Sequence, residues 1–469
     1  FPMSNSPDTP WYKLLNREHW FVFTMASLAW MFDCLDQQLF NLARPDAMKA
    51  LLKPGQDPKL FGGYATAIFV AGWAMGGLIF GAVGDRIGRA KTLTFTVLIY
   101  SLCTGLSAFS TGFTDFAIYR FITGLGVGGV FGLAVALVAD SLPDKARPSA
   151  LGLLQALSAV GNVTASLIAI CVGYLELGRI TPGSAWSKLF LIGALPAFLC
   201  VFIQVRLKEP EKWVKAKAAS KASGTQFGSY SALLGNPRWR SRAIAGLFMC
   251  VAGVVGVWGI GFFSVELIND VIGRALREEG VAKELIPGNT TIWKGINLMM
   301  QNVGAFLGMM TFTRLAARFG RKPVLSVAFL AALLSTWFTF RFLNQRSDIF
   351  WMIPIMGFCQ MSVFAGYAIY LPELFPVSLR STGTSFCYNV GRFLAAAGPY
   401  SLGQLSVWLT PAIAAAALDT EKAAAKLQGF RDACCWMSLV FLVGIIAVRF
   451  LPETKGLPLP EDQDAAKAL

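Results

Sequence analysis

Long apolar runs separated by short polar segments organise the whole chain. A helix that crosses a bilayer needs roughly 20 mostly apolar residues, and we find about 12 runs of that length. They cover residues 20–43, 60–83, 92–110, 115–139, 148–174, 186–205, 243–268, 292–312, 323–342, 349–371, 381–409 and 431–450. The runs show no sustained alternation of apolar and polar residues, which excludes barrel strands. The pattern therefore predicts an all-α membrane protein with about 12 transmembrane helices.

Composition supports this class. The chain of 469 residues is 55% hydrophobic and only 14% charged, too apolar for an ordinary soluble protein. Lysine and arginine are more frequent on the side of the amino terminus, most of all within 206–242. The positive-inside rule therefore predicts that both termini are cytoplasmic, and we expect a bacterial inner membrane location. The net charge of +14 needs no nucleic-acid partner, since a basic cytoplasmic face beside anionic lipid accounts for it.

Two loops recur in the second half of the chain. The segment 81–91 (GAVGDRIGRAK) returns in weakened form as 313–323 (TRLAARFGRKP), and 140–147 (DSLPDKAR) returns as 373–380 (ELFPVSLR). A looser echo links 207–209 (LKE) with 451–453 (LPE). Such self-similarity indicates that the two halves of the chain are internal repeats of one another. We expect two pseudo-symmetric six-helix bundles, residues 1–205 and 243–469, joined by a cytoplasmic linker, 206–242, with amphipathic helices at the membrane interface.

Charged side chains inside the runs are candidates for function, because an ionisable group at membrane depth is costly. Asp33 and Asp36 lie on one face of the first helix, although one of them could simply cap or pair near the outer rim. Arg120 lies roughly 7 Å below the outer surface and Asp36 roughly 10 Å below it. An Asp36–Arg120 pair would reduce the cost of both charges, and protonation of the aspartate would release the arginine. A static structural ion pair is the alternative.

Arg392 stands in the eleventh run, roughly 16 Å from the predicted cytoplasmic surface. A buried arginine there requires a water-filled cavity and a carboxylate partner. We expect an anionic substrate as that partner; Glu373 or an acid of the first half is the alternative. Uncharged polar side chains in this and other runs either line the substrate path or join helices. They are Gln155, Asn162, Gln301, Asn302, Gln360, Tyr367, Tyr388 and Asn389.

Enzyme chemistry is not indicated. The nine cysteines fall in apolar runs without metal-ligand spacing and are interpreted as core residues. The single histidine, His19, is expected at the membrane interface. No nucleophile with a base and no nucleotide loop is found, because the glycines of 124–129 follow an apolar helix and not a strand. We predict no catalytic residues, no metal and no cofactor.

The whole chain resembles a major facilitator superfamily transporter. The resemblance rests on 81–91 (GAVGDRIGRAK), its echo at 318–322 (RFGRK), Arg120 followed by glycines, and 452–455 (PETK). It departs from the pattern at Ala317, where an acid is usual. The resemblance implies two six-helix bundles, a midplane cavity and rocker-switch alternating access. It also implies cytoplasmic gating networks formed by Asp85, Arg86, Arg89, Asp140, Arg147, Arg318, Arg321, Glu373 and Arg380.

Within that superfamily, 372–376 (PELFP) and 386–392 (FCYNVGR) are similar to sialate and related organic-acid proton symporters. The paired Asp33 and Asp36 resemble those of the aromatic-acid and sialate groups, with Cys34 in place of a frequent glycine. The sugar-porter double glutamine is missing at 253–259 (GVVGVWG), and the sugar-porter motif after helix six is only partly present at 209–213 (EPEKW).

These features predict a proton-coupled symporter of a small organic anion, such as a monocarboxylate or sialate. Asp36, with Asp33, would carry the proton, Arg120 would respond to it, and Arg392 would hold the substrate carboxylate. The expected partners are substrate, protons and the lipid bilayer, and a monomer is expected. A sugar or organic-cation uniporter or exchanger stays open, with Asp33 or Asp36 binding substrate directly. A non-transporting sensor on the same fold is the third alternative.

Overall fold

The computed structural model describes residues 10–56, 58–177, 185–204, 206–223, 226–281, 286–396, 398–410 and 419–461, and these are overwhelmingly helical. The first helices are α1 (Arg17–Leu51), α2 (Pro58–Ile87), α3 (Arg89–Ser107), α4 (Phe113–Ser141), α5 (Arg147–Leu177) and α6 (Ala185–Gln204). Two shorter helices follow, α7 (Glu211–Ser223) and α8 (Tyr230–Gly235). The remainder are α9 (Pro237–Trp258), α10 (Ser264–Glu278), α11 (Ile286–Phe319), α12 (Arg321–Phe342), α13 (Met352–Leu374), α14 (Arg380–Ala396), α15 (Gly398–Leu409), α16 (Asp419–Ser438) and α17 (Val440–Arg449).

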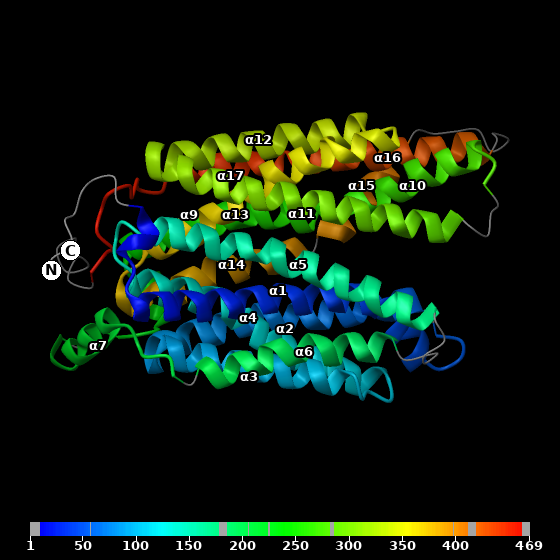
Figure 1. The fold of residues 1–469 in the computed structure, drawn as a ribbon. Helices are drawn as coiled ribbons and strands as arrows, with labels where there is room; N and C mark the ends of the chain where they lie inside the picture. Colours follow the sequence, from blue (N-terminus) through cyan, green and yellow to red (C-terminus); the bar gives the residue numbers. More distant parts are fainter. Residues whose placement is uncertain are drawn as a thin grey trace.

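The long helices run side by side in two groups (Figure 1). On one side α2 and α3 pack against α4, and α1 packs against α5; on the other α11 packs against α13, and α9 against α17. The groups meet where α14 lies on α2 and where α11 lies on α5. The largest apolar cluster continues through both groups, and a second one lies among α10, α12, α13 and α16. The arrangement agrees with the expected two bundles, while their boundaries at residues 205 and 242 stay a prediction.

The structure corrects several expected boundaries. The run 243–268 is not one helix: α9 ends at Trp258, a 3-10 turn covers Gly261–Phe263, and α10 then continues to Glu278. Gly259 and Gly261 explain the break, since glycine is the poorest helix former after proline. Residues 273–278, which lie between the seventh and eighth expected runs, are part of α10.

Three other runs also differ from expectation. The run 381–409 forms α14 and α15, and the run 431–450 is divided between α16 and α17. Helix α1 continues to Leu51, into the expected loop 44–59, and α16 starts within the expected external stretch 410–429. Residues 411–418 of that stretch lie outside the described residues.

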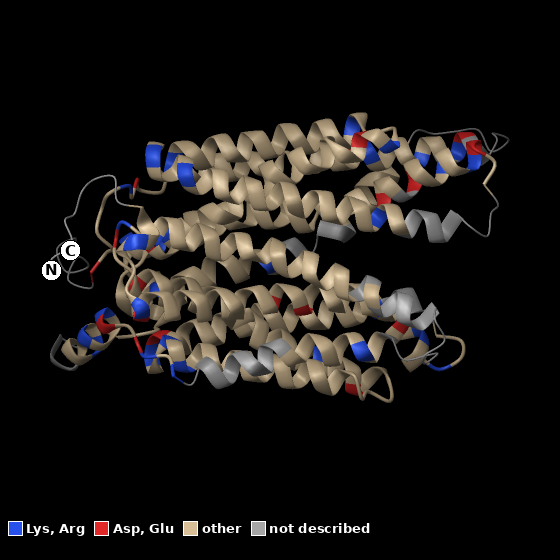
Figure 2. Cartoon of the chain, viewed as in Figure 1, with Lys and Arg blue, Asp and Glu red and all other residues tan. Residues whose placement is uncertain are grey.

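The outer surface of the helices suits a bilayer. Seven helices of the described chain are long and apolar enough to cross a membrane. Charged side chains gather toward the two ends of the molecule and are sparse between them (Figure 2). Exposed large apolar side chains occur along the helices and include Ile79, Phe95, Leu102, Leu195, Val327, Leu334, Trp436 and Ile446. These features are those of an integral membrane protein.

Candidate functional site

A central cavity of about 70 Å³ lies between the two groups of helices. One water molecule needs roughly 10–15 Å³ of such a volume, so the cavity can hold only a few water-sized groups. Its aromatic and aliphatic lining includes Trp30, Cys34, Trp73, Val257, Trp258, Leu298, Ala305, Met361, Phe364 and Tyr388. Its polar lining consists of Gln37, Gln38, Asn41, Gln155, Ser158, Asn162, Gln301, Asn302 and Arg392.

Arg392 is held between aromatic rings at this cavity. Its Cζ lies 3.4 Å from the ring centroid of Trp73, 4.5 Å from that of Tyr388 and 5.8 Å from that of Trp258. The side chain is 95% buried and its Nε has no hydrogen-bond partner among the described residues. Glu373, the expected in-chain alternative, pairs with Arg321 instead at 2.9 Å. The guanidinium therefore retains donors for a ligand in the cavity.

Trp73 reaches Arg392 because α14 lies on α2, and α2 in turn approaches α4 closely. A Cβ added at Gly128 of α4 would overlap the backbone carbonyl oxygen of Trp73. Glycine thus lets the two backbones meet. The same close packing places Trp73 beside Trp258 of α9, with ring centroids 6.0 Å apart and the planes nearly perpendicular. Aromatic side chains from both groups of helices therefore surround the guanidinium.

Six of the predicted substrate-binding residues line the cavity and three do not. Those on the lining are Gln155, Asn162, Gln301, Asn302, Tyr388 and Arg392. Gln360 is turned toward α12 and donates to Thr336 at 2.7 Å, and the hydroxyl of Tyr367 donates to the carbonyl oxygen of Met249 at 2.7 Å. Asn389 donates to the carbonyl oxygen of Ser385 and faces α2. Each of the three lies on a helix face that packs against a neighbour and not against the cavity.

Sequence reasoning missed one complete face of α1. Trp30, Cys34, Gln37, Gln38 and Asn41 all line the cavity. They recur at helical spacing, so they share one side of the helix. Three amides within a 12-residue stretch of a membrane helix were a detectable signal, which the neighbouring aspartates obscured. Trp73 gave no such signal, because a tryptophan in an apolar run usually packs in the core or at the interface.

The predicted pair of Asp36 and Arg120 is present. Asp36 Oδ2 lies 3.8 Å from Arg120 Nη1, and both residues are fully buried. Asp36 Oδ1 accepts a hydrogen bond from Thr104 at 2.7 Å, while Arg120 donates to the hydroxyl of Ser107 at 2.7 and 3.0 Å. Arg120 also lies 4.8 Å from the ring of Phe190. The pair therefore joins α1, α3 and α4 behind the cavity.

Asp33 lies one turn from Asp36 but in different surroundings. It is fully buried, and neither carboxylate oxygen has a hydrogen-bond partner among the described residues. Gln37 approaches it without reaching hydrogen-bonding geometry, and Arg392 is the cation that acts on it electrostatically. Asp33 thus lacks the polar contacts that Asp36 makes with Arg120 and Thr104.

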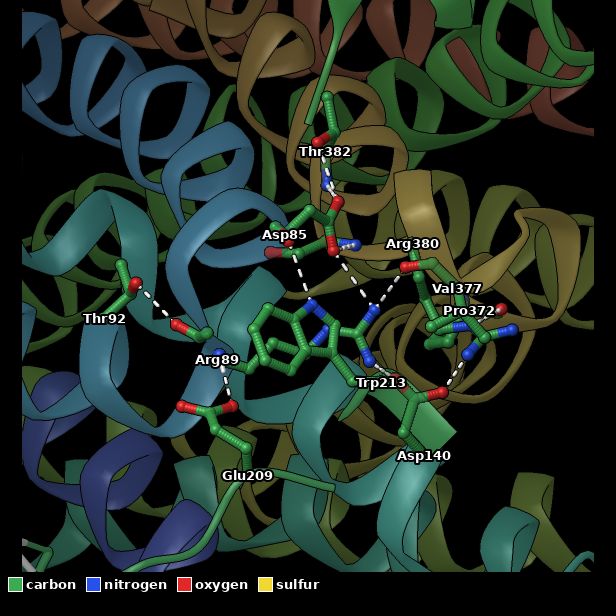
Figure 3. A network of polar contacts seen from close by, with 12 residues as sticks. Asp85, Arg89, Thr92, Asp140, Glu209, Trp213, Pro372, Val377, Arg380 and Thr382 are labelled. Atoms are coloured by element: carbon green, nitrogen blue, oxygen red, sulfur yellow. Dashed lines mark hydrogen bonds and ion pairs between the residues drawn. The ribbon is translucent and has the colours of Figure 1, made fainter. Parts of the chain in front are cut away.

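A polar network closes one end of the molecule, which we term the network end. Asp85 of α2 accepts hydrogen bonds from the backbone N–H and hydroxyl of Thr382, at 2.8 and 2.7 Å. Arg89 donates to Asp85 at 3.1 Å and to the carbonyl oxygen of Val377 at 2.6 Å (Figure 3). Since Thr382 and Val377 belong to the second half of the chain, these bonds hold the two halves together.

The same network contains a second acid. Asp140 of α4 forms ion pairs with both Arg89 and Arg380, and Arg380 also donates to the carbonyl oxygen of Pro372 at 3.0 Å. Arg86 donates to the carbonyl oxygen of Phe227. The charged residues of this network are among those that the family resemblance implied for gating.

The second half carries a related arrangement. Arg321 makes two hydrogen bonds to Glu373, at 2.9 and 3.0 Å, and Arg147 pairs with Asp144 nearby. Arg318 is exposed, and its guanidinium carbon lies 5.3 Å from the ring centroid of Phe319. The echo of 207–209 and 451–453 also has a structural basis. Glu209 accepts from the first backbone N–H groups of α3, and Glu453 accepts from those of α12.

Metal chemistry finds no support in the described part of the chain, where no group of three or more His, Cys, Asp or Glu side chains could hold an ion. The buried acids lie beside arginines or next to backbone donors instead.

Comparison with known proteins identifies the class. The profile of the Major Facilitator Superfamily matches residues 26–399, and the chain belongs to this superfamily of membrane transporters. It is 26% identical to the cis,cis-muconate transport protein of Acinetobacter baylyi over 73% of this chain and 78% of that protein. It is 26% identical to the benzoate transport protein of the same organism, over 82% and 83% of the two chains. The sialic acid transporter NanX of Escherichia coli is 25% identical, over 83% and 88%.

Solved structures show the same fold. The proton:xylose symporter XylE superposes with a TM-score of 0.65 at 17% sequence identity, covering 94% of this chain and 97% of that one. The predicted 12-helix transporter fold is thereby confirmed. The resemblance to organic-acid and sialate transporters is confirmed as homology to proteins of those groups.

Proposed function

We propose that the protein is a secondary active transporter that carries a small organic anion together with a proton, by rocker-switch alternating access in a bacterial inner membrane. The setting of Arg392 carries this proposal. It is a cavity-lining guanidinium with an unpaired Nε, while Glu373, the acid of its own half expected as an alternative partner, pairs with Arg321. A carboxylate is the ligand that best matches such a donor. Two of the related proteins are named as transport proteins for benzoate and cis,cis-muconate, which are both carboxylates.

Asp36 is the proposed proton site. Neither Asp36 nor Arg120 belongs to the described lining of the cavity, so their ion pair responds to protons without contacting substrate. Protonation of Asp36 would remove its attraction for Arg120 and leave that cation with Ser107 and aromatic rings. The contacts among α1, α3 and α4 would then change.

Asp33 connects this proton site with the substrate site. It shares a helix face with Asp36 and acts electrostatically on Arg392. A substrate carboxylate and the Asp33 carboxylate would compete for one guanidinium, so entry of the anion favours a proton on α1. Import of one monoanion with one proton carries no net charge.

The network end is the proposed cytoplasmic gate, with both termini on that side. Asp85, Arg89, Asp140 and Arg380 join the two halves there, and Arg86, Arg147, Arg321 and Glu373 surround them. Inward opening requires these bonds to break. The two bundles, residues 1–205 and 243–469, would rock against each other, and residues 206–242 would link them. Both bundles belong to one chain, so a monomer would be sufficient for transport.

A sugar carrier is the second candidate, because amide side chains such as Gln155, Asn162 and Gln301 line the cavity. Amides can donate to and accept from hydroxyl groups. Arg392 would then have a structural role. An organic cation is disfavoured, since the charged residue on the described lining is an arginine.

Uptake into proteoliposomes tests the proposal. Labelled benzoate, cis,cis-muconate, sialate and glucose are offered with and without an inward proton gradient. We expect at least one carboxylate to accumulate above equilibrium and to lose accumulation in Arg392→Gln and in Asp36→Asn. Arg341→Gln, at an arginine of α12 that pairs with Asp432, is the matched control and should retain it. Gradient-independent equilibration of glucose, without carboxylate accumulation, would overturn the proposal.

A further inference from the structure

We infer that the transported anion bears a single carboxylate together with an uncharged hydrogen-bonding group that donates a hydrogen, such as a hydroxyl, and that Gln155 selects for this group. The inference rests on the proposed function and narrows its substrate class. It follows from the charge of the cavity lining and from one buried amide oxygen that has no partner.

The cavity offers one cation. Among the described lining residues Arg392 is the only charged side chain. Trp73 covers one face of its guanidinium, so the edges remain to meet a carboxylate. A dicarboxylate would bring a second negative charge into a small cavity whose other polar groups are neutral. Burial of a charge without a counter-charge is costly. The lining therefore favours a monoanion.

The remaining polar groups are neutral, and three of them already have partners. Ser158 donates to the backbone carbonyl oxygen of Gln155 at 2.7 Å, and Asn162 donates to Asn302 at 3.1 Å across the two halves. Asn302 also donates to the carbonyl oxygen of Leu298. These bonds fix the lining of α5 and α11 without any ligand.

Gln155 differs from these neighbours. The residue is only 2% exposed and lines the cavity, but its Oε1 has no hydrogen-bond partner among the described residues. Buried polar atoms of this kind are rare and costly unless something pairs with them. An amide oxygen accepts hydrogen bonds and cannot donate, so an ionised carboxylate does not match it. A hydroxyl or N–H group on the substrate does.

This pairing would give strong selectivity. A site built to hydrogen-bond a substrate hydroxyl rejects the analogue that lacks it, because the buried protein group is then left unpaired. A purely apolar cavity shows no such preference. The Gln155 amide oxygen and the single cation, Arg392, together distinguish three otherwise similar acids. One acid has no second polar group, one has a hydroxyl and one has a second carboxylate.

The test uses benzoate, 3-hydroxybenzoate and 1,3-benzenedicarboxylate, which differ only at one ring position. Proton-driven uptake into proteoliposomes is measured as kcat/KM for each acid near pH 7. We expect 3-hydroxybenzoate to exceed benzoate at least tenfold and the dicarboxylate to fall below benzoate. Gln155→Met, which keeps the chain length and removes the amide, should reduce the hydroxyl preference to less than threefold.

Gln360→Met is the matched control, because Gln360 is also a buried glutamine but bonds to Thr336 away from the cavity. It should leave the preference unchanged. Proton-driven uptake with benzoate equal to or better than 3-hydroxybenzoate, or with the dicarboxylate best, overturns this inference and leaves the proposed function standing. Rejection of all three acids, with no other carboxylate accumulated, overturns both. An unchanged preference in Gln155→Met removes Gln155 as its cause.

Discussion

The indole nitrogen of Trp213 donates a hydrogen bond to the backbone carbonyl oxygen of Asp85, over 2.9 Å. Trp213 belongs to α7 of the linker, and the carboxylate of Asp85 accepts from Thr382 of the second half. The Trp213 ring also packs against Phe227 and Val377 in a small apolar cluster of its own. One linker side chain therefore contacts both halves at the network end, and its removal should weaken that closure.

We expect Trp213→Ala to loosen the network end more than Trp213→Phe. Alanine loses the hydrogen bond and the buried ring, whereas phenylalanine loses only the hydrogen bond. Truncation of a buried aromatic residue costs about 3–5 kcal/mol. Hydrogen–deuterium exchange across residues 376–382 should accelerate in the order wild type, Trp213→Phe, Trp213→Ala. Trp337→Ala, on an exposed face of α12, should match wild type, and equal exchange in all four proteins would contradict this role.

Asp36→Asn should separate proton coupling from substrate movement. The neutral amide resembles a permanently protonated carboxyl, so exchange of substrate across the membrane should continue while gradient-driven accumulation falls at least tenfold. Arg120→Gln should instead destabilise the fold by about 3–5 kcal/mol, because it leaves the buried Asp36 carboxylate with Thr104 as its one hydrogen-bond donor. In Asp36→Asn, by contrast, Arg120 keeps Ser107 and the ring of Phe190. Thr104→Val removes a hydrogen bond to Asp36 and keeps the pair, and it should retain accumulation. Full accumulation in Asp36→Asn would reject this proton site.

The fold was largely predictable from the sequence, because bilayer thickness imposes a length on every apolar run. The Asp36–Arg120 pair was also predictable, since two charges at one depth in apolar surroundings have few partners to choose from. The helix break after Trp258 was missed. Glycine spacing alone does not distinguish a close helix contact from a helix end, and both occur along α9.

The cavity was predicted less well. Polar residues were selected one at a time, and a single Gln or Tyr in an apolar run does not show which way its helix face turns. Gln360 and Tyr367 share a face of α13 that packs on other helices, while Met361 and Phe364 face the cavity. Rotation of a helix about its axis is fixed by packing with its neighbours, which the sequence of that helix does not contain.

Gly88 and Gly320 each occupy a backbone conformation reserved for glycine, with φ of 126° and 97°. A Cβ at these positions would also meet the carboxylates of Glu209 and Glu453, which cap the following helices. We expect Gly88→Ala and Gly320→Ala each to cost about 1–3 kcal/mol, measured as a lowered Tm in detergent. Gly63→Ala should be neutral or stabilising, since its Cβ would meet nothing within 4 Å. An unaltered Tm in both loop variants would be inconsistent with strain at these turns.

Glu453 should give a pH-dependent contribution to stability. Burial alone would raise the pKa of its carboxyl, but backbone N–H groups of Arg321, Lys322, Lys455 and Thr454 donate to it and lower the pKa overall. A lowered folded-state pKa stabilises the fold above the unfolded-state pKa, and that stabilisation is lost as pH falls through the folded-state value. The Tm difference between wild type and Glu453→Gln should therefore be largest near pH 7 and shrink below about pH 4.

Glu278→Gln, at an exposed glutamate of α10, is the control for the loss of one carboxylate from the surface. The assignment of a lowered pKa to Glu453 would be contradicted if the Tm difference between wild type and Glu453→Gln stayed constant or grew as pH fell.

Trp73 should govern affinity through Arg392. Its ring lies flat enough against the guanidinium, 3.4 Å from centroid to Cζ, to hold that group in one orientation. A desolvated cation–π contact contributes about 2 kcal/mol and tryptophan makes the strongest one. Trp73→Leu should therefore raise the KM for a transported carboxylate by roughly 30-fold, and Trp73→Phe by less. Since Trp73 also contacts Trp258 across the two halves, Trp337→Leu serves to show the cost of losing an unrelated tryptophan. An unchanged KM in Trp73→Leu would mean that Arg392 is oriented by Tyr388 alone.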